Sequence, residues 1–207
     1  MVDVYVEEEG GVWFGVAYDG DKVCATWFGR DQEQTLKGLR GSLPRGASHQ
    51  QTTKPSAFAK NVIATIKNIE AGKDATSRFK LATEHLPAYT AKVLEAAYLI
   101  PTGYVSSYGG IAKAVGGGPR AVGNIMAGNP FAPIVPCHRV IASDFGLGGY
   151  AGGLKAKLAM LKRESRGFKE NKDIPVKGGK LRIYPVEMVL KKATKGKTCN
   201  TRTGPCE

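Results

Sequence analysis

Cysteine, long apolar runs and acidic residues are all scarce in this sequence of 207 residues. Its four cysteines are too few for a scaffold built on disulfides, and they form no pair of CxxC motifs, so we expect no metal site. No apolar run approaches the roughly 20 residues that span a bilayer, and the first ten residues are acidic where a signal peptide is basic. These absences favour a protein of the cytoplasm, or of the nucleus in a eukaryote, without a membrane partner.

The shortage of acids leaves a strongly basic protein. It has 30 lysines and arginines against 18 aspartates and glutamates, a net charge of +12, and residues 169–207 carry half of that excess. A basic surface attracts polyanions and speeds their encounter with the protein, so nucleic acid is the first partner to consider. The 42% of hydrophobic residues is ordinary for one or two small globular domains.

The first third of the chain has the pattern of an α+β domain. Alternating and aromatic-rich segments predict three strands, of which the last two flank Asp19-Gly20-Asp21 as a β-hairpin. Apolar residues at helical spacing after Ser56, a good helix cap, predict an amphipathic helix that lies on the sheet. The predicted strands are residues 3–7, 12–18 and 22–28, the helices 31–40 and 58–69, and the loop between the helices 41–55.

Further along, glycine and proline divide the chain into short helices. The first begins after Pro87, the second is capped by Ser106 or Ser107, and the third runs from Pro119 to near Gly128. Two short helices joined by a Gly-rich turn are typical of a helix-turn-helix. After them we predict a strand-like run at 131–141, a helix at 154–164, a strand at 180–185 and a mobile segment at 191–207.

The third helix of this group has almost no side-chain bulk on one face. A glycine inside a helix costs about 0.5–1 kcal/mol relative to alanine, so it asks for a reason. One reading is close packing against neighbouring helices, and the other is close approach of the helix to a DNA groove. The small residues are Ala121, Gly123, Ala127 and Gly128.

Cys137 is followed directly by His138 inside an apolar run. A buried lone cysteine is by default a small, inert hydrophobic residue. A nucleophilic cysteine instead needs a base to reach the thiolate, and a neighbouring histidine serves if a carboxylate holds it in place. Spacing alone does not say which carboxylate that is.

Several segments of this part of the chain share the signature of one family. They are Ile100–Ala112, Pro119–Gly123, Gly128-Asn129-Pro130, Pro136-Cys137-His138-Arg139-Val140 and Gly149-Tyr150-Ala151-Gly152-Gly153. In this order and spacing they resemble the O6-alkylguanine-DNA alkyltransferases, and the strong part of the resemblance covers roughly residues 86–164. It implies an α+β protein with a ribonuclease-H-like α/β domain at 1–78, a mainly helical winged helix-turn-helix alkyltransferase domain at 79–168 and a basic extension at 169–207.

The resemblance implies direct reversal of DNA alkylation. Cys137 takes the alkyl group from O6 of a damaged guanine and keeps it as a thioether, so one protein repairs one lesion. No cofactor is implied. The expected partner is double-stranded DNA, bound through its minor groove with little regard to sequence by a monomer. Whether O4-alkylthymine is accepted, and whether binding along DNA is cooperative, stays open.

Catalytic roles carry over to five positions. Cys137 is the acceptor, His138 its base through a water, and Glu164 orients His138, although spacing alone favours a solvated charge for Glu164. Asn129 braces the turn that holds the cysteine, or is simply a helix cap. Tyr108 stacks near the extruded base and donates a proton to the leaving guanine, unless it is an ordinary half-buried aromatic.

Binding roles carry over as well. Tyr150 lines the base pocket, the backbone of Val140 and Ala151 hydrogen-bonds the guanine, and Lys157 helps to position the site. Arg120 enters the base stack in place of the flipped nucleotide, or else binds a phosphate at the helix N-terminus. The other residues expected at the DNA are Ala121, Gly123, Asn124, Ala127, Gly128 and Arg139.

Three rival functions remain to be weighed. A sequence-specific regulator needs long polar side chains on its recognition helix, and this helix offers mainly Arg120 and Asn124. A non-repairing, alkyltransferase-like protein that only flags lesions lacks the cysteine, which is present here. A cysteine hydrolase needs an oxyanion hole and a histidine distant in sequence.

The remaining features of the chain have modest roles. We expect Cys24 in the core, Cys199 and Cys206 as free thiols rather than a small disulfide, and the basic extension either in nonspecific phosphate contacts or without a role.

Overall fold

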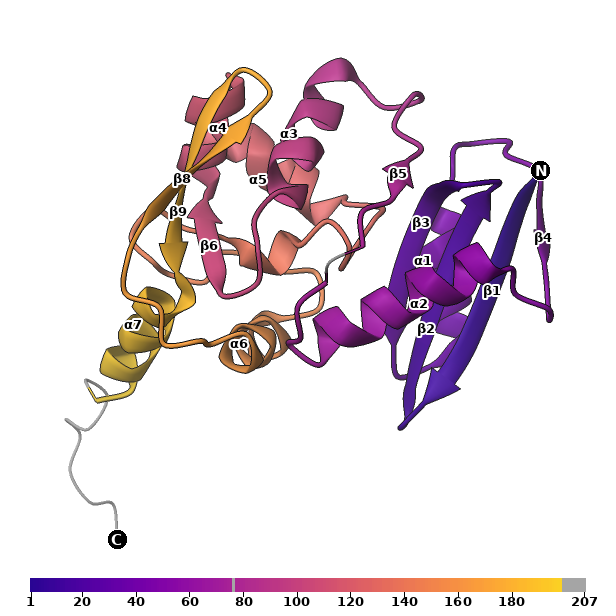
Figure 1. Ribbon diagram of the computed structural model, residues 1–207, viewed down its shortest axis with the longest axis horizontal. Coiled ribbons are helices and arrows are strands. Elements are labelled where there is room, and N and C mark those ends of the chain that lie inside the picture. The colour runs from indigo at the N-terminus through magenta and orange to yellow at the C-terminus, as the bar shows by residue number, and fades with distance from the viewer. Residues whose placement is uncertain (76, 199–207) are drawn as a thin grey trace, which may run out of the picture.

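The computed structural model describes residues 1–75 and 77–198. It has the α+β architecture expected, with a mixed sheet in the N-terminal domain and a second, more helical domain beside it (Figure 1). None of the helices in these residues is long and apolar enough to cross a membrane. Cys199 and Cys206 lie outside the described residues, whereas Cys24 is buried, as predicted.

The N-terminal sheet has five strands in the order β4-β1-β2-β3-β5. The predicted hairpin and its preceding strand are confirmed as an antiparallel meander, and two short parallel strands, β4 within the predicted loop and β5, extend its edges. The strands are β1 (Val2–Glu9), β2 (Val12–Asp19), β3 (Lys22–Gly29), β4 (His49–Gln51) and β5 (Lys80–Leu81).

Two helices cover opposite faces of this sheet (Figure 1). Successive side chains of a strand point to opposite faces, so Phe14 and Val16 pack in the core under α2 (Ala57–Glu70), while Ala17 packs with residues of α1 (Gln32–Gly41). Both predicted helices are confirmed. The predicted cap is confirmed too, because Ser56 Oγ accepts a hydrogen bond from the Ala59 backbone N–H at 3.1 Å.

The second domain begins with the three predicted helices and adds a second sheet. The helices are α3 (Ala88–Tyr98), α4 (Tyr108–Val115), capped by Ser107, and α5 (Pro119–Ala127). The sheet has the order β7-β6-β9-β8. Its strands are β6 (Tyr104–Ser107), β7 (Val140–Ile141), β8 (Lys172–Val176) and β9 (Gly179–Pro185), and only the last was predicted.

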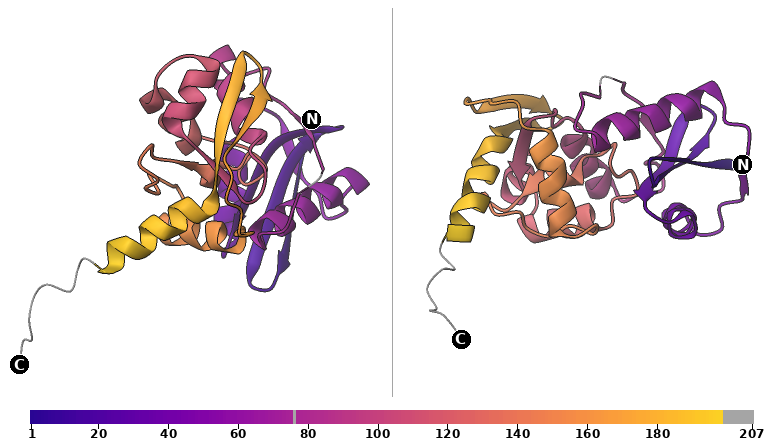
Figure 2. Two further views of the ribbon diagram at one scale, coloured as in Figure 1. Left: turned by 60° about the vertical axis from the view of Figure 1, so that its left-hand side comes forward. Right: turned by 90° about the horizontal axis from the view of Figure 1, so that it is seen from below.

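The final segment differs from expectation. The β8–β9 hairpin pairs with β6 in the second sheet, so this part of the basic extension is folded against the second domain. Helix α7 (Val186–Thr198) then follows, which makes the expectation of a mobile segment from residue 191 wrong as far as Thr198. The sequence hid this helix because its apolar face is short, yet Val186 and Val189 pack against Val105 and Leu161. Figure 2 shows the helix beginning at the second domain, with its C-terminal end extending away from it.

The strand-like run at 131–141 is also different from its prediction. Cys137–Arg139 form a 3-10 helix, and β7 begins at Val140. The apolar residues before Cys137 lie in a buried turn. The apolar character of the run reflects burial from all sides, which periodicity alone does not separate from a strand. The helix predicted next is confirmed as α6 (Leu154–Arg163), and Glu164 is its C-cap.

The two domains share one apolar core. A single cluster of buried side chains includes Phe14 and Ile66 of the first domain and Leu94 and Ile134 of the second. Beside it, the Thr26 backbone N–H donates to Pro130 O at 2.9 Å and Thr26 Oγ1 donates to Ala132 O at 2.9 Å. Strand β3 therefore contacts the turn that leads to Cys137.

Candidate active site

Asn129 ties together the turn that carries Cys137. Its Nδ2 donates to Val135 O at 2.8 Å, and its Oδ1 accepts from the Phe131 backbone N–H at 3.0 Å. Both groups are buried, and a buried amide satisfied at both ends fixes the shape of the chain around it. Asn129 thus lies where the predicted brace is needed, and it does more than end a helix.

Cys137 lies at a cavity of about 520 Å³ between α5 and the loop that precedes α6. Its side chain is 7% exposed, and burial raises the pKa of the thiol above its usual range, against the weaker lowering effects of Asn129 and Lys157. The resting residue is therefore a protonated thiol that needs a base. The cavity is lined by Tyr108, Arg120, Gly123, Asn124, Met126, Ala127, Cys137, Gly149, Tyr150 and Ala151.

His138 and Glu164 form a fully buried pair. Both side chains are 0% exposed, and His138 Nε2 lies 2.9 Å from Glu164 Oε1. Burial alone would raise the pKa of Glu164, but pairing with His138 and Arg139 lowers it to about 2. An ionised carboxylate accepts a hydrogen bond, so Nε2 carries the ring proton and Nδ1 keeps its lone pair. Nδ1 is buried and has no hydrogen-bond partner among the residues that the structure describes.

His138 is neutral at physiological pH in this setting. Burial lowers its pKa below the ordinary value, and the nearby cations Arg139 and Lys157 lower it further, while Glu164 raises it. A neutral imidazole next to Cys137 in sequence, with a free lone pair and an anion behind it, is a proton acceptor. The structure thus brings Glu164 to His138, the neighbour of Cys137, across 26 residues of sequence.

Arg139 corrects one expectation. It was grouped with the DNA-contacting residues, but it is 5% exposed and its guanidinium is directed into the protein. Nε donates to both oxygens of Glu164, at 3.1 and 2.9 Å, and Nη2 donates to Oε1 at 2.8 Å. The remaining contacts go to Ile100 O at 2.7 Å and Thr102 Oγ1 at 3.1 Å. With its guanidinium enclosed in this way, Arg139 has no access to a phosphate.

The two predicted tyrosines line the cavity, and Lys157 is buried behind them. Lys157 is fully buried, and its Nζ donates to Val140 O at 2.6 Å and Gly149 O at 3.3 Å. Burial lowers its pKa to about 8, with Cys137 acting in the opposite direction. Its Nζ lies 5.9 Å from each ring centroid of Tyr108 and Tyr150. Lys157 therefore ties the strand after His138 to the loop that lines the cavity.

The tyrosine hydroxyls remain protonated. Burial raises the pKa of Tyr108 and of Tyr150. Tyr108 donates to Gly149 O at 3.2 Å, and Tyr150 donates to Met160 Sδ at 3.5 Å. Each ring therefore lies against the cavity with a protonated hydroxyl that donates its hydrogen bond within the protein.

The small face of α5 is open rather than packed. Ala121, Asn124, Ala127 and Gly128 are exposed, and a Cβ at Gly123 would meet no described atom within 4 Å. Close packing therefore does not explain these small residues. Arg120 is exposed at the start of the helix and borders the cavity.

Three residues of the site were not predicted as site residues from the sequence. Met126 and Gly149 line the cavity, and Thr102 holds Arg139. Thr102 lies within a segment that carried the family resemblance, which was its only signal. The position of Met126 in α5 is typical of a residue on the apolar face of a helix, so nothing in the sequence marked it as part of a cavity.

Comparisons with known proteins agree with this geometry. Residues 88–166 match the family model described as 6-O-methylguanine DNA methyltransferase, DNA binding domain. A methylated-DNA–protein-cysteine methyltransferase of Thermococcus kodakarensis is 34% identical over 77% of this chain and 91% of its own length. A relative of the same description from Pyrobaculum aerophilum is 52% identical over 31% of this chain, which spans 44% of that protein.

Solved structures show the same relationship. The O6-methylguanine-DNA methyltransferase of Pyrococcus kodakaraensis aligns with a TM-score of 0.61 at 32% identity, over 79% of this chain and 99% of that one. Mycobacterium tuberculosis OGT in complex with DNA aligns with a TM-score of 0.60 at 27% identity, over 79% and 92%.

A helix-turn-helix beside a buried cysteine with its own base defines a DNA-binding protein that carries out nucleophilic chemistry. The chain belongs to the O6-methylguanine DNA methyltransferase family, the methylated-DNA–protein-cysteine methyltransferases that repair O6-methylguanine in DNA. It binds DNA.

Because its guanidinium is enclosed, we predict that Arg139 contributes to stability rather than to DNA binding. Arg139→Met leaves a buried carboxylate without its main partner, so we expect the free energy of unfolding in urea to fall by about 3–5 kcal/mol. Arg182→Met is the matched control, because it breaks an exposed pair with Asp173 and should cost less than about 1 kcal/mol. Equal stability of the two variants, with weaker DNA binding by Arg139→Met, would restore the DNA-contact reading.

Proposed function

We propose that Cys137 is the residue that accepts the alkyl group. The single observation that carries this is that Cys137 borders a 520 Å³ cavity that also borders the open face of α5, while His138, its neighbour in the sequence, is held by the buried Glu164. The Sγ–carbon bond forms as the carbon–O6 bond breaks. The proton of the thiol passes through a water to His138 Nδ1, and Tyr108 donates a proton to the departing guanine.

The electrostatics support a relay rather than a free thiolate. Burial keeps Cys137 protonated at rest, and His138 is a neutral acceptor backed by ionised Glu164. Imidazolium formed during transfer is stabilised by the adjacent carboxylate, as in other nucleophile–histidine–acid arrangements. The nucleophile is thus activated only when a substrate is present to take the electron pair.

The target base has to leave the duplex to reach this cavity. O6 of guanine faces the interior of the helix, and extrusion costs a few kcal/mol of stacking and pairing. We assign Tyr108 and Tyr150 to the flipped base, the backbone of Val140 and Ala151 to its hydrogen bonds, and Lys157 to the shape of the pocket. Arg120 fills the gap in the stack.

The open face of α5 fits a minor groove. Small residues let the helix backbone approach the groove floor, where base pairs are poorly distinguished, and a protein that inspects every sequence needs no more. The surrounding residues in this role are Ala121, Gly123, Asn124, Ala127 and Gly128. We propose that the protein binds as a monomer on double-stranded DNA, without a cofactor.

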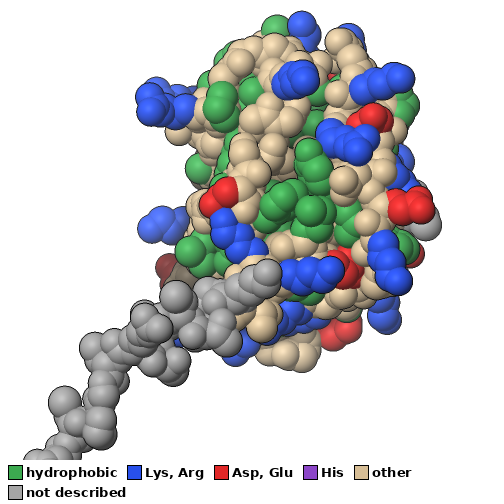
Figure 3. Space-filling view, turned by 90° about the vertical axis from the view of Figure 1, so that its left-hand side faces the viewer, with side chains coloured by type: hydrophobic (Ala, Val, Ile, Leu, Met, Phe, Trp, Pro, Cys, Tyr) green, Lys and Arg blue, Asp and Glu red, His purple; other side chains and the backbone are tan. Residues whose placement is uncertain are grey.

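The C-terminal hairpin adds positive charge beside α4. Lys172, Lys180 and Arg182 are exposed on β8 and β9, and β9 packs beside α4. Figure 3 shows this side of the molecule, where lysine and arginine side chains surround an apolar area and outnumber the acids. We propose that these cations contact phosphates nonspecifically, which steepens the salt dependence of binding.

Transfer to Cys137 ends the reaction. A thioether is a poor leaving group, and among the described residues that line the cavity Cys137 is the sole thiol. Each protein therefore repairs one lesion. The alternative is a protein that binds lesions or sequences through the same helices without taking up the alkyl group.

The transfer is tested by the mass of the intact protein. After incubation with a slight excess of duplex that contains O6-methylguanine, we expect a single gain of about 14 Da on the wild type and none on Cys137→Ala. The lesion should become guanine in the first case alone. Binding without a gain in mass, with the lesion intact, would favour the lesion-binding alternative.

The relay predicts how transfer depends on pH. Protonation of His138 removes its free lone pair, so the single-turnover rate constant should fall as pH decreases through the pKa of His138. Because burial lowers that pKa, we expect the rate to be flat around neutral pH and to decline only at pH values below the ordinary histidine pKa of about 6.5. If a preformed thiolate attacked instead, the raised pKa of Cys137 would make the rate climb steadily toward alkaline pH.

Arg120 is tested by comparing substrates that do and do not require extrusion. We expect Arg120→Ala to slow transfer from duplex O6-methylguanine by about tenfold or more, which corresponds to a loss of about 1.4 kcal/mol in stabilising the extruded state. Transfer from the free base needs no extrusion, so its rate should be unchanged. Lys113→Ala removes an equally exposed positive charge from α4 and should change neither rate appreciably. Equal effects on both substrates would show that Arg120 acts elsewhere.

A further inference from the structure

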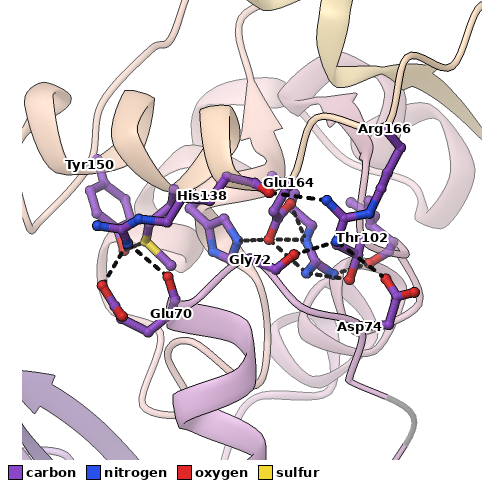
Figure 4. Close-up of polar contacts among 12 residues, drawn as sticks. Glu70, Gly72, Asp74, Thr102, His138, Tyr150, Glu164 and Arg166 are labelled. Carbon is purple, nitrogen blue, oxygen red and sulfur yellow. Dashed lines mark hydrogen bonds and ion pairs between the residues drawn. The ribbon is translucent and has the colours of Figure 1, made fainter.

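Glu164 lies between two arginines that hold the end of α2 in the other domain. Arg163 Nη1 donates to the backbone oxygen of Glu70 at 2.7 Å and to its Oε1 at 2.6 Å. Arg166 Nη2 donates to Gly72 O and lies 3.8 Å from Asp74 Oδ1. Figure 4 shows these groups next to the His138–Glu164 pair. The contacts join residues 93 and 94 positions apart.

The same arginines also shape the turn that carries Glu164. Arg166 Nη1 donates back to Arg163 O at 3.0 Å and to Ser165 O at 3.2 Å. Arg163 binds a carbonyl in the last turn of α2, where the helix dipole favours a cation. One set of contacts therefore closes the turn, and the other anchors it to the first domain.

Gly72 brings the two backbones into direct contact. Its φ is +72°, a conformation that favours glycine, and a Cβ there would lie 2.5 Å from Arg163 Cβ and 2.6 Å from the Arg163 carbonyl carbon and oxygen. The residue after that carbonyl is Glu164. Any side chain at position 72 thus presses on the peptide that sets the direction of the catalytic carboxylate.

Glu164 needs such support because it is a helix cap. Its backbone N–H bonds to Met160 O at 3.1 Å, but helix ends leave several carbonyls without partners inside the helix. Its carboxylate meanwhile has to serve His138 and Arg139 at once, at distances of 2.8–3.1 Å. A small rotation of the turn breaks one of these sets of bonds.

We propose that residues 70–74 of the N-terminal domain position Glu164, and through it His138, for proton transfer. Arg163, Arg166 and Gly72 are positioning residues, since none of them touches the reacting atoms. This inference rests on the proposed function and gives the N-terminal domain, taken as residues 1–78, a part in the chemistry. The alternative is that the same contacts merely hold the domains together.

Two substitutions disturb this contact from opposite sides. Gly72→Ala introduces a methyl group against the Arg163 backbone, and Arg163→Ala removes an arginine whose side chain is 46% exposed. The matched control is Lys67→Ala on the same helix, which breaks ion pairs with Glu7 and Glu9 inside the first domain. Arg163→Lys retains the charge and one donor.

The measurement is the single-turnover rate of methyl transfer at saturating duplex, together with thermal unfolding and DNA affinity. We expect Gly72→Ala to slow transfer by about tenfold and Arg163→Ala by a smaller factor, because misplacing a catalytic group by a fraction of an ångström costs rate. Arg163→Lys should recover most of the rate. Lys67→Ala should lie within about twofold of wild type, and DNA affinity should be unchanged throughout.

The pH profile separates positioning from stability. The charged groups acting on His138 are Glu164, Arg139 and Lys157, and of these Glu164 alone favours protonation. Loosening Glu164 should therefore move the acid limb of the rate to lower pH in Gly72→Ala and Arg163→Ala, and leave it in place in Lys67→Ala.

Each outcome is decisive. If both variants lose stability but keep the wild-type rate and the wild-type decline of the rate at acid pH, the positioning role is refuted. The contacts then only hold the two domains together. If Gly72→Ala does not fold, Arg163→Ala with its lysine counterpart decides the question, since an exposed pair adds little to stability. If the wild type itself transfers no methyl group, the proposed function fails, and this is distinguishable from a failure of the positioning role.

Discussion

The Glu164 carboxylate, fully buried and shared between His138 and Arg139, is the interaction on which the site depends. Burying a carboxylate is costly, and it is tolerated here because four hydrogen bonds satisfy it, one from His138 and three from the Arg139 guanidinium. Arg139 keeps it ionised, and the ionised carboxylate fixes which nitrogen of His138 carries the proton. The lone pair of Nδ1 is thereby left free, as the proposed transfer of the Cys137 proton requires.

The surrounding structure holds that carboxylate and its hydrogen-bond partners in place. Asn129 closes the turn before Cys137, and Lys157 links the strand after His138 to the loop over the cavity. The N-terminal domain contacts both supports, through Thr26 at the turn and through the end of α2 at Glu164. A domain without a residue in the cavity thus borders the catalytic groups at two points, which fits the continuous apolar core that the two domains share.

Local signals were sufficient for most of the secondary structure. Helices α1 to α6 and the first hairpin follow from capping residues, glycine and proline breaks and apolar spacing. Helix α7 was missed because its apolar face is short. The strands β6 and β8 were missed because they are short, and β6 is stabilised by pairing with β9, which is distant in sequence. The run before Cys137 was mistaken for a strand because a buried turn and a buried strand are equally apolar.

The amino-acid sequence alone specifies the capped helices, the adjacency of Cys137 and His138, and the small-residue face of α5, because each is a property of neighbouring residues. Tertiary structure decided which carboxylate serves His138, since Glu164 and a solvated helix-terminal glutamate look alike in a sequence. It also decided that Arg139 faces inward, because direction of a side chain depends on the chain packed around it. Charge, spacing and motif specify which groups are available, and only the packing of distant segments specifies which of them meet.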